Sequence, residues 1–232
     1  MSSIVYKIPE MDLIEVKSNI IYKENKGKYL FDICYPFDFL RYKKYPTVIL
    51  ISGGSGTSLK LNEKFKNGFL SWGRLLAASG LLTIQFNWNY KNPDDIVDLI
   101  NFIRSNADKY KVNSNHLSTF SFSRGVGKSF DKIVRENTGY LKSMVFYYGK
   151  ISPTLSHKKL TLPPIFIVMA GRDKFFNHDC NDKFVSTMKR NGNDIKLVSH
   201  LTGEHAFDIR NNDMRSVEII KQTVEFLKTN TN

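Results

Sequence analysis

Apolar, strand-like segments alternate with helix-like segments along most of this chain. The run TVILI at Thr47–Ile51 is rich in β-branched residues and leads into glycines at positions 53 and 54, which is typical of a strand buried on both faces of a parallel sheet. Strands that alternate with helices restrict the chain to an α/β architecture. Further strands are predicted at Leu81–Phe86, Leu117–Phe122, Met144–Tyr148, Pro164–Met169 and Ile195–Leu201.

The segments between these strands carry helical periodicity. In the stretch opened by Pro93 and Asp94, apolar residues recur at spacings of three and four as far as Asn106. Ile14–Tyr35 differs, because it alternates apolar and polar residues around a turn signal and so predicts an antiparallel hairpin. We therefore expect a mostly parallel central sheet with an antiparallel N-terminal hairpin and helices on both faces. Other helices are predicted at Ser71–Ser79, after Gly125, at Asp182–Arg190 and at Met214–Lys228.

Residues 1–232 are expected to form a single domain. The chain is 41% hydrophobic and 24% charged, which fits an ordinary globular protein and excludes disordered and fibrous classes. No apolar run approaches the roughly 18 residues of a membrane span, and the first residues carry charges where a secretory signal needs an apolar core. A cytoplasmic location is the resulting expectation. Cys34 and Cys180 are too few for a disulfide framework, so we interpret both as buried or inert thiols.

The net charge is +12, from 34 basic and 22 acidic residues. Its densest basic stretches, at 41–44 and 60–66, are interrupted by aromatic or acidic residues and form no long basic tail. This distribution favours a lysine-rich, solvated surface over a nucleic-acid-binding one. No nucleic-acid or membrane partner is therefore predicted, while an anionic small substrate would be attracted by the charge.

A candidate nucleophile follows one of the predicted strands. In open α/β sheets, functional residues lie at the carboxyl ends of the strands, and one such end reads Ser121-Phe122-Ser123-Arg124-Gly125. A serine on a sharp strand-to-helix turn requires small residues two positions away on either side, since larger side chains would collide with the folded backbone. Ser121 and Gly125 meet this requirement. The pattern is a relaxed nucleophile elbow, with Ser121 where glycine is usual.

Two further strand ends supply partners for this serine. Asp173 follows the apolar run PIFIVMA and is placed to orient an imidazolium, although a turn-capping role is the alternative. His205 follows the last strand and is a candidate general base and general acid, with a plain surface histidine as the alternative. The order Ser123, Asp173, His205, each after a different strand, is the order expected of a catalytic triad on an α/β-hydrolase sheet.

An oxyanion hole is also predicted. The backbone N–H of Arg124 follows the nucleophile at a helix N-terminus, where the helix dipole favours negative charge. The second donor is expected from the glycine loop after the first buried strand, from the amide of Gly54 or of Ser55. The sequence does not choose between these two residues.

These motifs resemble the α/β-hydrolase superfamily, and most closely its small lidless esterases and dienelactone-hydrolase-like proteins. The resemblance runs from about Ile14 onward and rests on DDIVDLINFIRSNADKYKVNSNHLSTFSFSRGVG, GRDKFFN and GEHAFD. It implies a serine hydrolase that cleaves a small or short-chain ester through an acyl-enzyme. Related esterases often have His-Gly-Gly where this chain has Ser52-Gly53-Gly54. Dienelactone hydrolases carry cysteine at the elbow, whereas this chain has Ser123.

Some motifs in the chain have rival interpretations. Gly127-Lys128-Ser129 resembles the end of a phosphate-binding loop, but the glycine that such a loop needs five positions earlier is Phe122. Asp179 is the second candidate for the triad acid.

No histidine pair has metal-ligand spacing, so neither a catalytic metal nor a cofactor is expected. The alternative functions are a non-catalytic binding protein on this scaffold, or a peptidase, thioesterase or acyltransferase with the same triad.

The substrate pocket is predicted to be open. Only about 15 residues separate Tyr148 from Pro164, which leaves no room for the large helical lid of lipases. Arg124 is a candidate ligand for a substrate carboxylate, with a plain surface position as the alternative. The aromatic residues expected to line the pocket, with a plain core position as the alternative, are Trp88, Tyr90, Phe175 and Phe176. The oligomeric state is not indicated by the sequence.

Overall fold

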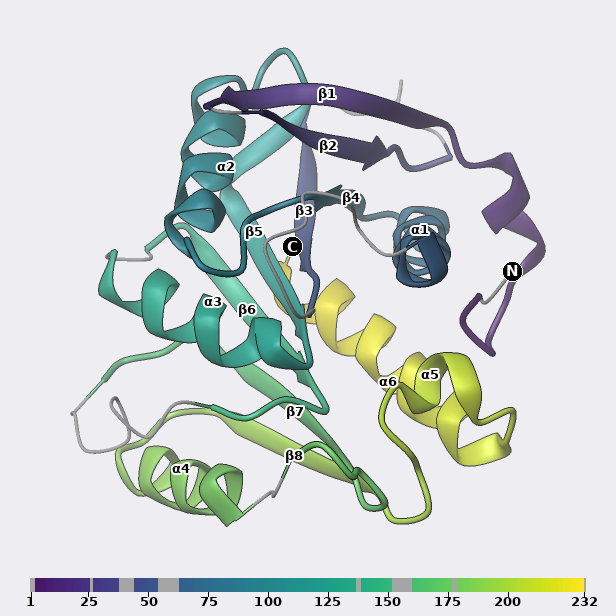
Figure 1. The fold of residues 1–232 in the computed structure, drawn as a ribbon, viewed down its shortest axis with the longest axis vertical. Helices are drawn as coiled ribbons and strands as arrows, with labels where there is room; N and C mark the ends of the chain where they lie inside the picture. Colours follow the sequence, from purple (N-terminus) through teal and green to yellow (C-terminus); the bar gives the residue numbers. More distant parts are fainter. Residues whose placement is uncertain are drawn as a thin grey trace.

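A mixed β-sheet forms the centre of the computed structural model, which describes residues 3–25, 27–37, 44–53, 63–136, 139–151, 160–176 and 179–231. In these ranges the sheet has eight strands in the order β1-β2-β4-β3-β5-β6-β7-β8 (Figure 1). The strands are β1 (Val16–Glu24), β2 (Lys28–Cys34), β3 (Tyr45–Ile51), β4 (Leu82–Phe86), β5 (Val112–Phe122), β6 (Leu141–Tyr147), β7 (Ile165–Ala170) and β8 (Ile195–His200).

The strand directions follow the two kinds of sequence pattern. β1 and β2 form the predicted antiparallel hairpin, and β2 also pairs antiparallel with β4. From β4 through β3 and on to β8, every neighbouring pair is parallel. The fold is therefore the predicted α/β-hydrolase fold, with an antiparallel hairpin at one edge of a parallel sheet. Because the parallel strands point the same way, their carboxyl ends meet along one edge of the molecule.

Helices cover both faces of the sheet. Figure 1 shows α2, α3 and α4 on one face and α1, α5 and α6 on the other. A short 3₁₀ helix, Pro9–Leu13, precedes β1. The helices are α1 (Glu63–Ala78), α2 (Asp94–Ser105), α3 (Arg124–Arg135), α4 (Asp179–Arg190), α5 (Phe207–Arg210) and α6 (Met214–Thr231).

β3 is buried on both faces, as the continuous apolar run at 47–51 predicts. Along β3, Ile49 and Ile51 belong to the core beneath α2, α3 and α4, whereas Val48 and Leu50 belong to the core beneath α1 and α6. All four side chains are at most 1% exposed. Alternate residues of one strand thus supply two separate cores, which fix the sheet from both sides.

Some elements differ from the sequence expectation. β5 begins at Val112 rather than Leu117, because Val112 pairs with Tyr45 of β3 and backbone pairing does not need apolar side chains. α1 begins at Glu63 rather than Ser71, and α4 at Asp179 rather than Asp182. The short α5 carries no sequence signal of its own, because four residues are too few for a periodic pattern.

Cys34 matches its predicted character. Its side chain is 1% exposed, and burial raises the pKa of its thiol to about 12, which keeps the thiol protonated and unreactive near neutral pH. The side chain of Cys180 lies outside the described residues. None of the helices in the described ranges combines the length and the apolar character that crossing a membrane requires.

Candidate active site

Ser123 lies on a strained turn between β5 and α3. Its backbone has φ 53° and ψ −129°, a region that non-glycine residues rarely occupy and that costs about 1–3 kcal/mol. The Ser123 N–H donates to the carbonyl of Tyr147 at 2.9 Å, and the Val126 N–H donates to the carbonyl of Ser123 at 3.1 Å. The turn is therefore tied both to the neighbouring strand and to the first turn of α3.

Close backbone packing explains why the turn needs small residues. A Cβ added to Gly125 would lie 2.6 Å from the carbonyl oxygen of Ser52. A Cβ added to Gly53 would lie 2.6 Å from the Cβ of Ser123 and 2.8 Å from the Phe122 carbonyl oxygen. Real Cβ atoms do not approach this closely. The loop after β3 thus packs directly against the candidate nucleophile.

Ser121 occupies the elbow position where glycine is usual. Its side chain is fully buried, and its hydroxyl lies 2.8 Å from that of Ser129 on α3, which itself donates to the Val126 carbonyl at 3.1 Å. The hydroxyl thus has a hydrogen-bond partner on the helix behind the turn. A buried polar group with a partner is tolerated, so serine is compatible with this position.

Backbone hydrogen bonds join the loops that carry Asp173 and His205. The Gly171 N–H donates to the carbonyl of His200, and the Arg172 N–H donates to the carbonyl of Gly203, both at 2.9 Å. These bonds continue the parallel β7–β8 pairing beyond the ends of both strands. Asp173 and His205, 32 residues apart in sequence, are therefore held next to each other.

The three predicted catalytic side chains form one hydrogen-bonded chain. Ser123 Oγ lies 2.9 Å from His205 Nε2, and His205 Nδ1 lies 2.7 Å from Asp173 Oδ2. The Asp173 side chain is fully buried and that of His205 is 15% exposed. With its proton on Nδ1, the imidazole donates to Asp173 and accepts from Ser123. This is the geometry that lets a histidine remove the serine proton.

Asp173 also has the turn-capping role that was its alternative interpretation. Its other oxygen, Oδ1, accepts a hydrogen bond from the Phe175 N–H at 2.7 Å. The same carboxylate therefore stabilises its own loop and faces the imidazole. The two interpretations describe two oxygens of one group and do not exclude each other.

Three aromatic rings surround His205. The ring centroids of Tyr148, Phe175 and Phe176 lie 4.8, 4.9 and 5.7 Å from that of the imidazole. Phe175 and Phe176 were predicted to line a pocket, and the structure places both against the histidine. Phe175 is 69% exposed, so its outer side is available to a bound substrate. Tyr148 was assigned only to a strand by the sequence pattern.

Trp88 and Tyr90 lie on the loop after β4. Trp88 is 7% exposed, and its Nε1–H donates to the hydroxyl of Ser52 at 3.3 Å. Its ring centroid is 5.7 Å from that of Tyr90, over which the ammonium group of Lys128 lies at 5.4 Å. Trp88 is thus mainly a support for Ser52 at the end of β3.

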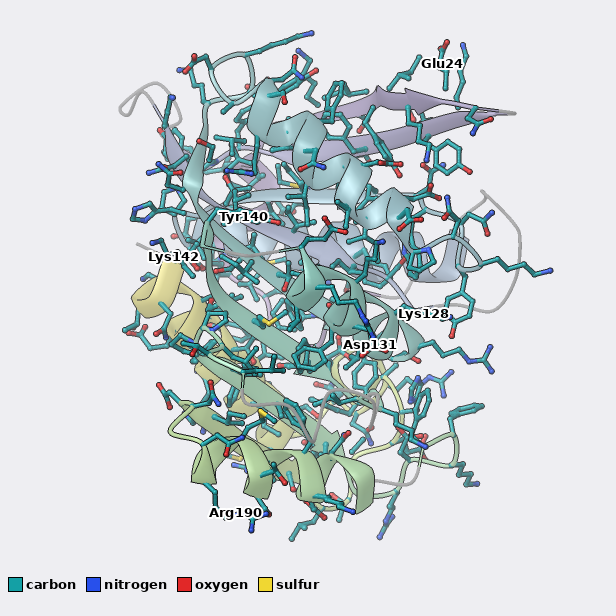
Figure 2. The ribbon with its side chains drawn as sticks, turned by 90° about the vertical axis from the view of Figure 1, so that its left-hand side faces the viewer. Glu24, Lys128, Asp131, Tyr140, Lys142 and Arg190 are labelled. Atoms are coloured by element: carbon teal, nitrogen blue, oxygen red, sulfur yellow. The ribbon has the colours of Figure 1, made fainter. Side chains whose placement is uncertain are left out.

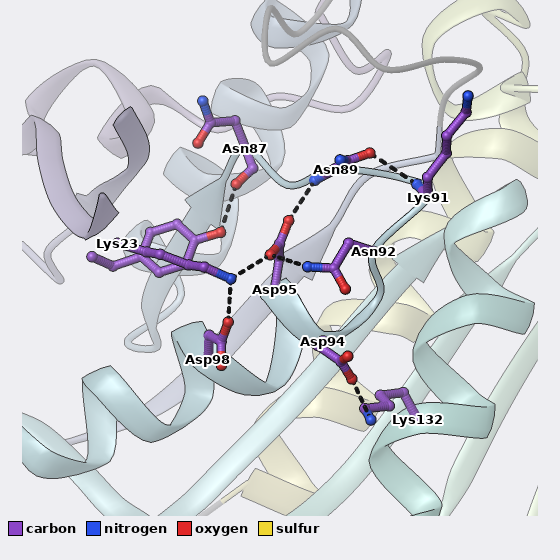
Figure 3. A network of polar contacts seen from close by, with 10 residues as sticks. Lys23, Asn87, Asn89, Lys91, Asn92, Asp94, Asp95, Asp98 and Lys132 are labelled. Carbon is purple, nitrogen blue, oxygen red and sulfur yellow. Dashed lines mark hydrogen bonds and ion pairs between the residues drawn. The ribbon is translucent and has the colours of Figure 1, made fainter. Parts of the chain in front are cut away.

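A polar network joins the loop after β4 to α2 and to the N-terminal hairpin (Figure 3). Asp95, fully buried in α2, accepts hydrogen bonds from the Asn89 N–H at 2.9 Å and from the Asn92 side chain at 2.9 Å. Lys23 of the hairpin binds Asp95 at 2.8 Å and also contacts Asp98. The hairpin and α2 together therefore fix the segment that carries Trp88.

Two predicted oxyanion donors, Gly54 and Ser55, lie outside the described residues. Arg124 opens α3 directly after Ser123, so its N–H is at a helix N-terminus, and its side chain is exposed.

Two rival interpretations of other residues concern α3 and α4. Lys128 and Ser129 lie inside α3, where backbone amides take part in helical bonding and cannot wrap a phosphate. Asp179 begins α4, and its side chain is not among those described.

Charged side chains of both signs are spread over the face covered by α2, α3 and α4 (Figure 2). Lys128 and Asp131 lie on α3, and Lys132 of the same helix pairs with Asp94 of α2. Within the described residues this mixed pattern is that of a solvated surface. No group of three metal-ligating side chains occurs in the same ranges.

A family model for dienelactone hydrolases matches residues 89–230, which is more than half of the chain. The chain belongs to the dienelactone hydrolase family. The matched region contains Ser123, Asp173 and His205 and leaves out the Ser52 loop. Comparison with curated protein sequences finds no match.

Solved esterases share the fold of this dienelactone hydrolase family member. Butyrate-bound esterase 2 of Thermogutta terrifontis superposes with a TM-score of 0.75 at 16% identity, covering 95% of each chain. The same enzyme phosphoramylated by tabun gives 0.76 at 15% identity, covering 95% of this chain and 96% of the other. A Rhizomucor miehei esterase gives 0.74 at 15% identity, covering 94% of this chain and 85% of that one.

The contact between Gly53 and Ser123 predicts a specific defect. Gly53→Ala should push the glycine loop or the serine out of position and lower kcat/KM for an ester about 100-fold, because small displacements of reacting groups are costly. Gly139→Ala is the matched control, since a Cβ there meets no described atom within 4 Å. Equal activity of the two variants in an ester-hydrolysis assay would contradict the close packing.

The two carboxylates that bind Lys23 should differ in importance. Asp95→Asn should lower the free energy of unfolding by about 2 kcal/mol, because the fully buried side chain loses its charge and one of the acceptor oxygens that bind the loop donors and the partly exposed Lys23 ammonium. Asp98→Asn should cost less than about 1 kcal/mol, since the Asp98 side chain is 44% exposed. Urea unfolding measures both values. A larger loss for Asp98→Asn would show that the loop does not depend on the buried carboxylate.

Proposed function

We propose that this protein is a serine hydrolase that cleaves a small or short-chain carboxylic ester through an acyl-enzyme. The observation that carries the proposal is the hydrogen-bonded chain from Ser123 through His205 to Asp173, with distances of 2.9 and 2.7 Å. Membership of a hydrolase family and the esterase fold support it. We treat residues 1–232 as one domain, because β1 and β8 belong to the same sheet.

The proposed reaction has two halves. His205 Nε2 takes the hydroxyl proton as Ser123 Oγ bonds to the ester carbonyl carbon, and the C=O electrons move onto the oxygen. The Arg124 N–H stabilises this oxyanion together with a donor from the Gly54 or Ser55 amide. The C–O bond to the alcohol then breaks, and the alcohol leaves with the proton from His205. Water attacks the acyl-enzyme by the same route, with His205 as base.

Short acyl groups fit the surroundings of the triad. Phe175, Phe176, Trp88 and Tyr90 are the proposed substrate-binding residues, and two of them contact His205. The structurally similar Thermogutta esterase 2 has been solved with butyrate and with propionate. The exposed Arg124 beside Ser123 favours substrates that carry a carboxylate. A panel of esters, thioesters and peptides that vary in acyl length and charge tests this assignment and the rival chemistries.

Substitution of the triad tests the mechanism. Ser123→Ala should abolish ester hydrolysis, and Asp173→Asn should lower kcat about 10⁴-fold, because the imidazole loses the acceptor that holds its tautomer. Asp179→Asn is the matched control for the second acid candidate and should retain nearly full kcat. Full hydrolysis by Ser123→Ala would refute the proposal. Loss of activity in Asp179→Asn alone would reassign the acid.

A fluorophosphonate probe separates an enzyme from a binding protein on the same scaffold. An activated serine attacks phosphorus and becomes covalently labelled, whereas an ordinary hydroxyl does not react. We expect labelling at Ser123 that is lost in His205→Gln. Absence of labelling in the wild-type protein would favour the binding protein.

A further inference from the structure

A second buried carboxylate lies beneath the candidate triad. Asp208, three residues after His205, is fully buried in α5. Its Oδ1 accepts a hydrogen bond from the hydroxyl of Tyr148 at 2.9 Å, and its Oδ2 accepts one from the Trp72 Nε1–H at 2.7 Å. The reaction described above uses neither Asp208 nor Tyr148. A buried carboxyl group is costly to maintain, so its presence here requires a reason.

Tyr148 connects this carboxylate to the imidazole. Its ring meets His205 edge-on with centroids 4.8 Å apart, while its hydroxyl binds Asp208. Its N–H donates to the Val168 carbonyl at 2.8 Å, which fixes the residue to β7. The same side chain therefore contacts the histidine with its ring and the carboxylate with its hydroxyl.

Two residues at this contact have a strained backbone. Tyr148 has φ 36° and Ala206, next to His205, has φ 63°. Both residues are non-glycine in the left-handed region, where each costs about 1–3 kcal/mol, and such residues cluster at functional sites. Tyr148 directly follows β6, its ring lies against His205, and its hydroxyl is bonded to Asp208.

Donors on both carboxylate oxygens favour the ionised form of Asp208. Burial raises its pKa above the ordinary value, and the hydrogen bonds from Trp72 and Tyr148 act in the opposite direction. Burial together with the negative charge of Asp208 also raises the pKa of Tyr148 well above the usual value, so the phenol stays protonated as a donor.

The other titratable groups around this site have separate partners. Asp173 faces His205 Nδ1, and the hydroxyl of Tyr147 bonds with that of Thr223 on α6. At the start of α6, Asp213 is bonded to His200 and to the Ser216 N–H. Of these carboxylates, Asp208 is the one that accepts the hydrogen bond of the Tyr148 hydroxyl. The ring of the same tyrosine contacts His205.

We propose that Asp208 and Tyr148 are positioning residues for His205, in which the tyrosine ring fixes the plane of the imidazole and the buried carboxylate stabilises the imidazolium that forms during acyl transfer. The inference rests on the proposed triad and adds a second carboxylate to it. Asp173 orients the proton-bearing nitrogen, while Asp208 acts through Tyr148 from within the core. Negative charge near the ring stabilises the imidazolium more than the neutral imidazole, so its removal should favour the neutral form.

The test is the pKa of His205, measured by NMR titration of the imidazole resonances. The chain has five histidines, and the His205 signal is identified by its absence in His205→Gln. Asp208→Asn keeps the size of the side chain and removes its charge, and should lower the pKa of His205 by about one unit. Tyr148→Phe should lower it by a smaller amount, because Asp208 loses a donor and becomes easier to protonate.

Activity provides the second readout. In Asp208→Asn, the acid limb of the kcat/KM profile for an ester should move to lower pH together with the NMR pKa, and kcat should fall roughly tenfold with little change in KM. Tyr147→Phe is the matched control. It removes a neighbouring buried hydroxyl that bonds to Thr223, so it should lower Tm without moving the titration of His205.

The outcomes distinguish this inference from the proposed function. A His205 pKa that moves by less than roughly 0.2 units in both Asp208→Asn and Tyr148→Phe would overturn the inference, even in an active enzyme. Should Asp208→Asn fail to fold, Tyr148→Phe decides alone, and an unchanged pKa again overturns it. A lowered pKa in a protein that hydrolyses no ester would support the Asp208–Tyr148 contact and refute the hydrolase proposal.

Discussion

The strained backbone at Ser123 is the constraint on which the site depends. A non-glycine residue at φ 53° is retained only where its surroundings compensate for the cost. Here the turn is bonded to Tyr147 of β6 and packed against Gly53, and α3 begins directly after it. The parallel pairing of β5 with β3 and β6 therefore does more than build a core. It determines where the serine hydroxyl lies and which backbone N–H stands beside it.

The same sheet determines the distance from the serine to its partners. Backbone bonds that extend the β7–β8 pairing hold the loops of Asp173 and His205 together, and aromatic rings then limit how the imidazole can rotate. Water is largely excluded from Asp173, so its hydrogen bond to His205 is stronger than it would be in solvent. The N-terminal hairpin contributes as well, because Lys23 binds Asp95, and Asp95 binds the loop whose Trp88 donates to Ser52.

The sequence predicts those parts of the molecule that local patterns encode. Continuous apolar runs predict the parallel strands, and glycines at strand ends predict the loops that carry Ser123, Asp173 and His205. Tyr148 and Asp208 could not be predicted in the same way, because their contact joins residues 60 positions apart and depends on how a strand end meets a four-residue helix. The support that Trp88 gives to Ser52 is another long-range contact. Gly54 and Ser55 lie outside the described residues, so the assignment of the second oxyanion donor to one of their amides stays a prediction.

Whether this geometry makes Ser123 a nucleophile is measured most directly by mass spectrometry of the protein quenched in acid during turnover of a slowly deacylated short-chain ester. We expect one acyl group per chain, located on the peptide that contains Ser123 and absent when His205 is replaced by glutamine. An acyl group on another residue, or hydrolysis with no acylated protein at any time, would contradict it.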